Sequence, residues 1–121
     1  NICDNVSDNA FFHSYILGDT IVRPYDIPLE EVGLTVFHNG AQSLSGTGAG
    51  VMGHPAEGVI WLANRMLDVG MPLKAGELIL SGSFTGGILA SPGDTFEAVY
   101  SDNLGCIRVN FENKPHAEGE T

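Results

Sequence analysis

Hydrophobic and polar residues alternate over a short stretch in the first half of the chain, which predicts a strand followed by a tight hairpin. Residues 33–37 alternate, and the next three residues are His38, Asn39 and Gly40. Asn-Gly is a strong signal for a two-residue hairpin turn, because both residues accept the left-handed backbone that such a turn requires. The returning strand is expected at residues 41–45.

A second hairpin is expected near the C-terminal end of the sequence. Its strands are residues 95–100 and 106–111, joined by a turn at residues 102–105. Apolar residues fall at every second position of the last strand, so they share one face. Two further apolar runs, residues 12–17 and 78–80, are too short for helices and are expected to be strands, the second of them fully buried.

One segment has the periodicity of a helix. Pro55 suits its first turn and Gly70 its C-terminal cap. Between them, four apolar residues fall at the i, i+3, i+4, i+7 spacing of an amphipathic helix: Val59, Leu62, Ala63 and Met66. We expect this helix to pack its apolar face on the sheet.

Together these elements predict a mostly β, α+β fold, a mixed-sheet roll or sandwich with one main helix. A chain of 121 residues forms one domain at most. Residues 25–31 are typical of a turn-rich connection. Residues 114–121 are expected to be a disordered polar tail, which leaves residues 1–113 as the folded part.

The net charge of −10 argues against a polyanionic partner such as nucleic acid. Only five Lys and Arg residues are scattered along the chain, whereas binding to a phosphate backbone requires clustered cations, so nucleic acid is excluded. No apolar run approaches the roughly 18 residues of a membrane helix, so no membrane segment is expected. Cys3 and Cys106 are too few and too far apart for a disulfide framework or a zinc site, and reduced thiols of a cytoplasmic protein are expected.

Four stretches, in order along the chain, resemble one group of enzymes. They are DNVSDNAFFHSYILGD at residues 4–19, GHPAEGVIWLAN at 53–64, LKAGELILSGSFT at 73–85 and PGDTFEAVY at 92–100. These stretches are similar to the C-terminal signature of the 2-hydroxypentadienoate and 2-oxohept-3-enedioate hydratases. Those hydratases are relatives of 4-oxalocrotonate decarboxylase within the fumarylacetoacetate hydrolase superfamily. The resemblance covers nearly the whole chain and implies the same fold that the periodicity predicts.

The resemblance also implies residues that this sequence does not contain. The hydratases bind Mg²⁺ or Mn²⁺ through three carboxylates, two of them in a Glu-x-Glu arrangement, and use a lysine and an acidic residue from their N-terminal half. Here the only acidic pair with that spacing is Glu118 with Glu120, in the tail. The catalytic and metal-binding residues are therefore expected upstream of Asn1. Residues 1–113 are then the C-terminal part of a catalytic domain, expected to bind no metal and to be inactive alone.

Hydroxyl groups follow the apolar run 78–80, in Ser81, Ser83 and Thr85, and two glycines come next. Such hydroxyls, together with neighbouring backbone N–H groups, can donate to a carboxylate or an enolate oxygen. An ordinary Gly/Ser turn explains the same pattern equally well. The resemblance makes Ser83 and Thr85 the strongest substrate-binding candidates in the chain.

The loop before the helix supplies further candidates. Gly50 and Gly53 would let the backbone approach an anionic substrate near the helix N-terminus. His54 has the chemistry to carry a proton, but capping of the helix is the favoured interpretation. Ser7 either forms a turn or, as the resemblance implies, contacts the substrate carboxylate. Three apolar residues are candidates for the pocket lining or for the core: Met52, Phe84 and Leu89.

The resemblance implies a hydro-lyase that adds water to a 2-hydroxy-2,4-dienoate in the meta-cleavage degradation of aromatic compounds. The Gly-His-Pro at residues 53–55, where the decarboxylases more often have a segment like Gly-Asn-Pro, favours a hydratase. Three alternatives stay open: metal-dependent decarboxylation of a 2-oxo-3-enedioate, hydrolysis of a carbon–carbon bond, and a non-catalytic partner subunit. A homo-oligomer is expected, and the resemblance also implies association with a sister decarboxylase or hydratase.

Overall fold

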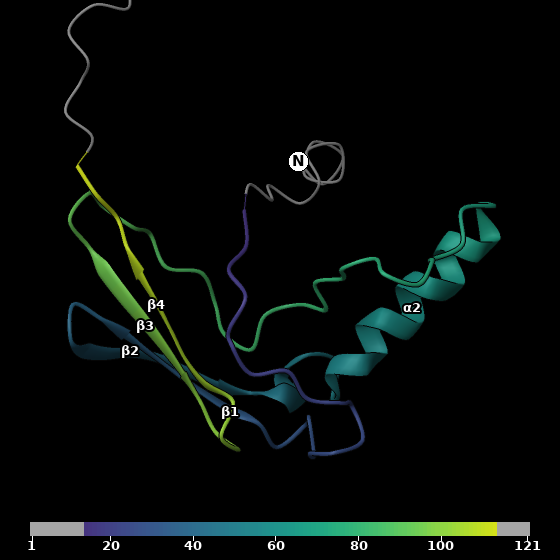
Figure 1. Ribbon diagram of the computed structural model, residues 1–121, viewed down its shortest axis with the longest axis horizontal. Helices are drawn as coiled ribbons and strands as arrows, with labels where there is room; N and C mark the ends of the chain where they lie inside the picture. The colour runs from purple at the N-terminus through teal and green to yellow at the C-terminus, as the bar shows by residue number, and fades with distance from the viewer. Residues whose placement is uncertain (1–13, 114–121) are drawn as a thin grey trace, which may run out of the picture.

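The computed structural model describes residues 14–113. Figure 1 shows two regions, a twisted sheet at one end and a single long helix at the other, connected by irregular segments. Four expectations lie wholly or partly outside the described residues. They are the reduced thiol of Cys3, Ser7 as a site residue, the strand that begins at residue 12, and the tail at residues 114–121.

The sheet has four strands, and every pair of neighbours is antiparallel. The strands are β1 (Gly33–His38), β2 (Ala41–Thr47), β3 (Thr95–Tyr100) and β4 (Gly105–Asn110), in the spatial order β2-β1-β3-β4. This arrangement and one main helix confirm the mostly β, α+β class. The expected mixed sheet, which requires a parallel pair, is not found among residues 14–113, where all three strand pairs are antiparallel.

Both predicted hairpin turns are present, and left-handed residues close them. Asn39 and Gly40 have φ of 49° and 83° between β1 and β2. Asp102 and Asn103 have φ of 55° and 58° between β3 and β4. Asn and Asp accept this backbone more readily than other residues with side chains, so the two turns depend directly on the local sequence.

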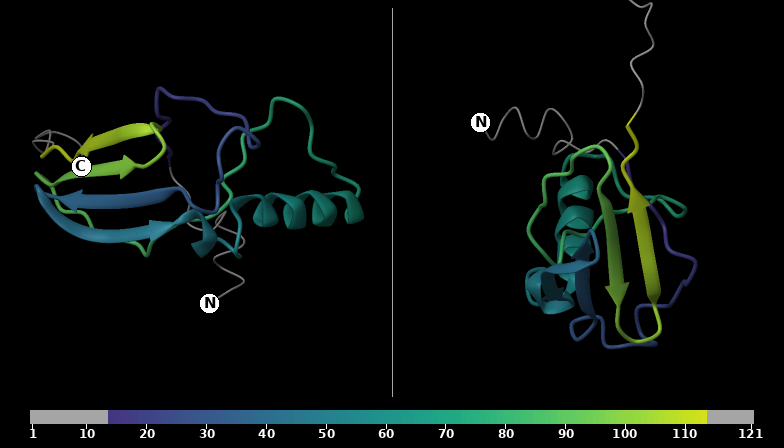
Figure 2. Two further views of the ribbon diagram at one scale, coloured as in Figure 1. Left: turned by 90° about the horizontal axis from the view of Figure 1, so that it is seen from below. Right: turned by 90° about the vertical axis from the view of Figure 1, so that its left-hand side faces the viewer.

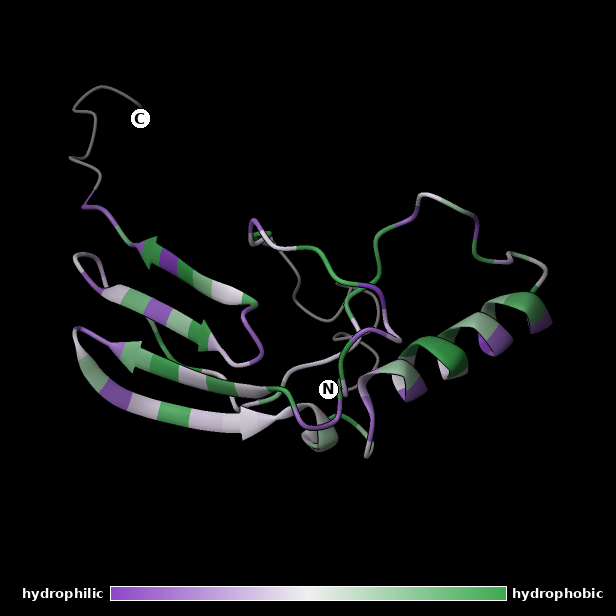
Figure 3. Ribbon diagram, turned by 60° about the horizontal axis from the view of Figure 1, so that its bottom comes forward, coloured by the Kyte–Doolittle hydropathy of each residue, from purple (hydrophilic) through white to green (hydrophobic). Residues whose placement is uncertain are grey.

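The register gives the sheet one apolar face and one mixed face. Val36, Ala98 and Ile107 lie opposite one another on neighbouring strands, and all three belong to the apolar face. On the other face, the Nε of Arg108 donates to the carboxylate of Glu97 at 3.0 Å across β3 and β4. Figure 3 shows the resulting alternation of hydrophobic and hydrophilic residues along the strands.

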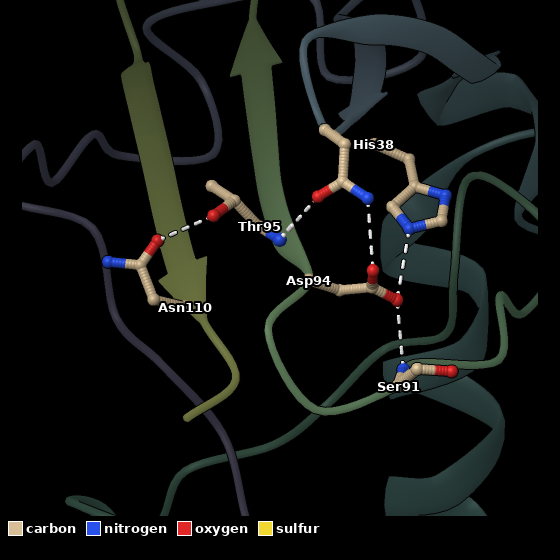
Figure 4. Close-up of polar contacts among 6 residues, drawn as sticks. His38, Ser91, Asp94, Thr95 and Asn110 are labelled. Carbon is tan, nitrogen blue, oxygen red and sulfur yellow. Dashed lines mark hydrogen bonds and ion pairs between the residues drawn. The ribbon is translucent and has the colours of Figure 1, made fainter. Parts of the chain in front are cut away.

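Side chains tie the β1–β2 turn to the start of β3, as Figure 4 shows. The Asn39 side chain donates to Asp94 Oδ1 at 2.9 Å and accepts from the Thr95 backbone N–H at 2.8 Å. The other oxygen of Asp94 accepts from the Ser91 N–H at 2.9 Å and lies 3.0 Å from His38 Nε2. We call this set the Asn39–Asp94 clasp, and it fixes the end of one hairpin against the other.

The buried hydrophobic core of the described residues is small and lies beside one end of the sheet. Val32, Leu34 and Val51 are its members, with exposed fractions of 2%, 8% and 6%. Val32 and Leu34 bracket the start of β1, and Val51 belongs to the loop that leads to the helix. The core therefore joins the two regions of the molecule at their boundary.

The helix α2 (Pro55–Asp68) has the predicted limits. His54 is its N-cap, because Nδ1 accepts a hydrogen bond from the Ala56 N–H at 3.0 Å, so the capping interpretation is confirmed. Gly70, with φ of 75°, follows the last turn. The predicted apolar face is half-buried, whereas three apolar residues elsewhere on the helix are exposed: Ile60, Trp61 and Leu67.

The position of α2 differs from the prediction that it packs on the sheet. Figure 2 shows the helix continuing away from the end of the sheet. The strand β2 leads into it through the short helix η2 (Gly48–Gly50) and residues 51–54. The helix therefore lies beyond the end of the sheet and not on either of its faces.

Two predicted strands are not found in the described residues. Residues 78–80 are irregular, and Leu78 and Leu80 are 53% and 60% exposed, so the prediction of a buried strand is wrong. Residues 14–17, the described part of the first apolar run, are also irregular and exposed. A strand requires a partner for its backbone groups, and neither segment pairs with any of the four described strands.

Candidate functional site

The segment from Gly46 to the start of α2 and the loop that contains Ser83 and Thr85 lie against each other. A side chain at Gly46 would place its Cβ 2.0 Å from the backbone oxygen of Phe84. A Cβ at Gly58 would lie 2.8 Å from the backbone oxygen of Ser81. These glycines therefore let residues 81–84 approach β2 and the first turns of α2, a contact within the chain itself.

The hydroxyl groups of Ser83 and Thr85 are hydrogen-bonded within their own loop. Ser83 Oγ donates to the backbone oxygen of Thr85 at 2.7 Å and accepts from its N–H at 3.2 Å. Thr85 Oγ1 donates to the backbone oxygen of Gly86 at 3.1 Å. These bonds are typical of a Ser/Thr turn. A role in substrate binding would require the hydroxyl protons to turn from the loop toward a ligand.

The two candidate glycines before α2 have different surroundings. A Cβ at Gly50 would lie 3.5 Å from the Phe84 oxygen, so this glycine adjoins the Ser83 and Thr85 loop. Gly53 has φ of 84° and open space around it, so it serves the turn into the helix. The structure thus brings Gly50, Ser83 and Thr85 together and places Gly53 apart from them.

His54 is held by two contacts on opposite sides of its ring. Nδ1 accepts from the helix backbone, which leaves Nε2 as the protonated nitrogen of the neutral ring. Nε2 lies 3.3 Å from Glu30 Oε2. Both ring nitrogens therefore have structural partners, and His54 orients the start of α2.

A groove of about 500 Å³ lies over the apolar face of the sheet. One wall comes from β1, β3 and β4, and the others from residues 14–16 and 85–90. Of the predicted site residues within 14–113, Thr85 alone lines it. The described residues of the lining are Ser14, Tyr15, Ile16, Val36, Thr85, Gly86, Ile88, Ala90, Phe96, Ile107, Val109 and Phe111. A concave, mostly apolar site with a few polar groups is the usual form of a small-molecule site.

The described lining of the groove has no Asp, Glu, His, Lys or Arg side chain. The ionised groups nearby in the described residues are paired with one another. Glu97 and Arg108 border a second, smaller depression of about 280 Å³ that opens on the other face of the sheet. His38 stacks on Phe96 with ring centres 4.5 Å apart, but its Nε2 faces the Asp94 carboxylate.

The pKa of Asp94 is lowered from its ordinary value. The hydrogen bond from the Asn39 side chain is the largest cause, and the bond from the Ser91 backbone is the next. Desolvation raises the pKa and so opposes these two, while His38 adds a smaller lowering contribution. The carboxylate form is therefore favoured, which maintains the clasp at one end of the sheet.

Thr85, a residue of the predicted loop, lines the groove, and the sheet side of the groove was not predicted. Phe84 is half-buried and meets Tyr100 edge-on at 6.3 Å. Leu89 is 94% exposed and Met52 is 67% exposed, so neither belongs to the core and neither lines the groove. The alternation in the last strand identified its apolar face, but the sequence carried no sign of which segments would cover it.

The described residues do not fit a divalent metal. Within residues 14–113 no three His, Cys, Asp or Glu side chains gather in a metal-binding arrangement.

Residues 14–113 contain no helix that is long and apolar enough to cross a membrane.

Comparison with known proteins gives the family. The family model for the C-terminal region of fumarylacetoacetate (FAA) hydrolase matches residues 2–112, so the chain belongs to this family. Within it, the chain is 40% identical over 110 residues to 2-oxo-hept-4-ene-1,7-dioate hydratase of Escherichia coli. It is equally similar to 2-keto-4-pentenoate hydratase of Paraburkholderia xenovorans. These matches cover 91% of the chain and 41% and 40% of the two relatives.

A solved structure supports the fold assignment. 4-Oxalocrotonate decarboxylase from Pseudomonas putida G7, complexed with magnesium and adipate, matches with a TM-score of 0.65 and 33% identity. The match covers 71% of this chain and 32% of the decarboxylase. A second structure of that enzyme, with calcium and acetate, matches with a TM-score of 0.68. The chain thus spans about two fifths of the length of the curated relatives it matches.

Proposed function

We propose that the protein containing this chain is a hydratase that adds water to a 2-hydroxy-2,4-dienoate. The observation that carries the proposal is the 39–40% identity, over 110 residues, to four enzymes that are named as hydratases of such acids or of their keto forms. The apolar groove beside the Thr85 loop supports it, since a dienoate has a short hydrocarbon chain to bury.

The proposed reaction has two balanced steps. The enol gives up its O–H proton and carbon 5 gains a proton, which converts the dienol into a conjugated 2-oxo-3-enoate. Water then adds across the remaining double bond, its oxygen to carbon 4 and a proton to carbon 3. The product is a 4-hydroxy-2-oxo acid, and no group leaves the substrate.

The part of this chain in the reaction is to bind and orient the substrate. Ser83, Thr85 and Gly50 adjoin one another, and the proposal assigns them to the polar end of the acid. Gly53 and Ser7 keep the same proposed role with less support, because Gly53 stands apart from this cluster and Ser7 lies outside the described residues. The hydrocarbon end would lie against the apolar side chains of the groove.

A divalent cation, Mg²⁺ or Mn²⁺, is proposed for the whole enzyme, where it supplies Lewis-acid stabilisation of an enolate. Support comes from the solved decarboxylase, which was obtained with magnesium and with calcium. Catalytic and metal-binding groups are proposed to lie in parts of the protein beyond this chain. A homo-oligomer in the cytoplasm is proposed as well, supported by the exposed apolar side chains of α2.

The test is an assay of the whole protein with 2-hydroxypenta-2,4-dienoate and added Mg²⁺ or Mn²⁺. We expect loss of the dienol absorbance and formation of the 4-hydroxy-2-oxo acid, with activity abolished by a chelator. Absence of hydration by the metal-loaded protein would refute the proposal.

Decarboxylation of a 2-oxo-3-enedioate is the second candidate function. It is favoured by the solved decarboxylase and by the 34% identity to 4-oxalocrotonate decarboxylase of Pseudomonas putida. Release of carbon dioxide from 4-oxalocrotonate, measured beside the hydration assay, distinguishes the two activities. We expect hydration to be the faster reaction.

The loop hydroxyls allow a sharper test of the site. If Ser83 or Thr85 donates to a substrate oxyanion, replacement with Ala lowers kcat/KM by roughly 10–1,000-fold. The melting temperature of the variant serves as the control. If both variants keep full activity and melt earlier, the hydroxyls only form the turn that the structure shows.

A further inference from the structure

We infer that His54 is a positioning residue for the polar end of the site, and that it acts in this way only while its ring is neutral. The inference rests on the proposed function, in which Gly50, Ser83 and Thr85 bind the polar end of the acid. His54 would touch none of the reacting atoms and would fix the loop that carries Gly50 against the start of α2. Acid should then weaken substrate binding through this residue.

Glu30 holds both ends of the loop that carries Gly50. At one end, the backbone oxygen of Glu30 accepts from the Ala49 N–H at 2.8 Å. At the other end, the Glu30 carboxylate lies 3.3 Å from His54 Nε2. Between them, Val51 is 6% exposed, and its backbone oxygen accepts from the His54 N–H at 3.0 Å. The loop is therefore a closed unit, and the His54 side chain is the part of it that reaches α2.

The ring of His54 connects this loop to the first turn of α2. Pro55 has no N–H, so Ala56 carries the first amide proton of the helix, and it donates to His54 Nδ1 at 3.0 Å. In the same turn, a Cβ at Gly58 would lie 2.8 Å from the backbone oxygen of Ser81, which leads into the loop of the two candidate hydroxyls. The cap thus lies between the two parts of the polar cluster.

Both contacts of the side chain require the neutral ring with its proton on Nε2. In that form Nδ1 accepts from Ala56, and the Nε2 proton is directed at the Glu30 carboxylate. A second proton would bind to Nδ1, where it would meet the N–H of Ala56. Two donors would then face each other, so the bond to α2 would be lost while the contact with Glu30 remained.

Charged groups face His54 from both segments that it joins. The Glu30 carboxylate approaches from the residues before β1, and Glu57 lies in the first turn of α2. The attraction of the ring to these carboxylates is opposed by the positive end of the helix. The His54 side chain is 36% exposed, so protons reach it from solvent. Histidine is the side chain that ordinarily changes charge between about pH 5 and pH 8, the range in which the cap should respond.

The experiment measures KM and kcat of the whole, metal-loaded enzyme for 2-hydroxypenta-2,4-dienoate at about pH 8 and about pH 5.5. The unmodified enzyme is compared with His54→Asn and His54→Ala. Asn is among the best N-cap residues and does not titrate in this range, so His54→Asn keeps the cap and removes the titration. Dividing by the values of His54→Asn at the same pH cancels the effects of all other titrating groups.

The expected changes fall on KM, because the positioned groups bind the substrate and do not react. At the higher pH, His54→Asn should stay within about twofold of the unmodified enzyme, whereas His54→Ala should raise KM by about fivefold. At the lower pH, KM of the unmodified enzyme should be about fivefold above that of His54→Asn. The kcat of all three proteins should change little relative to one another.

Amide hydrogen exchange in the whole protein gives a second measurement, which does not need activity. After correction for the intrinsic effect of pH, protection of the Ala56 N–H should fall by about fivefold at the lower pH in the unmodified protein. It should stay constant in His54→Asn. The Thr95 N–H is the matched control, because its acceptor, Asn39 Oδ1 at 2.8 Å, is a side chain that does not titrate.

The outcomes separate this inference from the proposed function. The same pH dependence of KM in the unmodified enzyme and in His54→Asn would overturn the inference. Unchanged KM in His54→Ala would overturn it too. If His54→Asn is as impaired as His54→Ala at the higher pH, His54 acts through its own chemistry and the positioning role is refuted. Hydration by none of the proteins would refute the proposed function, and the exchange of Ala56 would still decide whether the ring holds the helix. If His54→Ala does not fold, the comparison with His54→Asn decides the question.

Discussion

The sheet and the helix of this chain differ in where their stabilising contacts come from. Each strand of the sheet pairs with a neighbour described in the same chain, and the clasp around Asp94 fixes one hairpin to the other. The helix α2 makes few contacts with other elements and exposes Ile60, Trp61 and Leu67. A sheet built from hairpins satisfies its own backbone, whereas an amphipathic helix depends on a surface that covers its apolar side chains.

The largest effect is expected at the boundary between the two regions. In Gly48→Ala, the new Cβ would lie 1.8 Å from the backbone oxygen of Leu29, so the backbone must move. We expect the free energy of unfolding of the whole protein to fall by roughly 4 kcal/mol or more, measured by denaturant unfolding. Gly87→Ala is the control, because nothing lies within 4 Å of its position. Equal stability of the two variants would mean that the close approach at Gly48 is not required.

The next prediction compares leucines of the two regions. Leu34 in β1 is 8% exposed and Leu80 in the loop after α2 is 60% exposed. Leu34→Ala should cost about 2–4 kcal/mol of unfolding free energy through lost burial and a cavity. Leu80→Ala should cost roughly 0.5 kcal/mol or less. A large cost at Leu80 would show that other parts of the whole protein cover this loop.

The clasp predicts how the sheet responds to acid. The lowered pKa of Asp94 contributes stability that is fully present above the pKa of the unfolded chain, about 3.9 for Asp. That contribution is lost as the pH falls through the lower folded-state pKa. We expect the melting temperature to fall in this acid range, and to fall less steeply in Asp94→Asn. The same pH dependence in both proteins would exclude Asp94 as the source.

The smallest effect is expected on the exposed face of the sheet. Arg108 and Glu97 form an ion pair, but their side chains are 65% and 29% exposed. Because solvent screens such a pair, Arg108→Ala should change the unfolding free energy by about 0–1 kcal/mol, measured by the shift of the denaturant midpoint. A larger loss would indicate that the stem of Arg108 packs against the sheet.

Local signals in the sequence predicted the elements that depend on local chemistry. Asn39 and Gly40 marked the first hairpin, and the spacing of apolar residues between Pro55 and Gly70 marked the helix. The wrong predictions concern segments whose structure depends on a partner far along the chain. The run 78–80 has the composition of a buried strand, yet no described strand pairs with it.

The candidate site shows the same division between local and long-range signals, and its assignment to substrate binding stays a prediction. Small residues and hydroxyls identified the loop around Ser83 and Thr85, and the structure places Gly50 beside it. The apolar wall that faces Thr85 comes from β1, β3 and β4, which are brought together only by the folded sheet. Tertiary arrangement of this kind has no short-range signature, so the groove could not be found from the sequence.

The Asn39–Asp94 clasp also makes the protein subject to chemical ageing. An asparagine followed by glycine is the sequence most prone to spontaneous deamidation, in which the next backbone nitrogen attacks the side-chain amide. At Asn39 this reaction would replace the donor that lies 2.9 Å from Asp94 Oδ1 with a second carboxylate. Two like charges at that distance repel, so the end of the hairpin would loosen in older molecules. Peptide mass mapping of stored protein, read beside its melting temperature, tests this: deamidation at Asn39 without a lower melting temperature would disprove it.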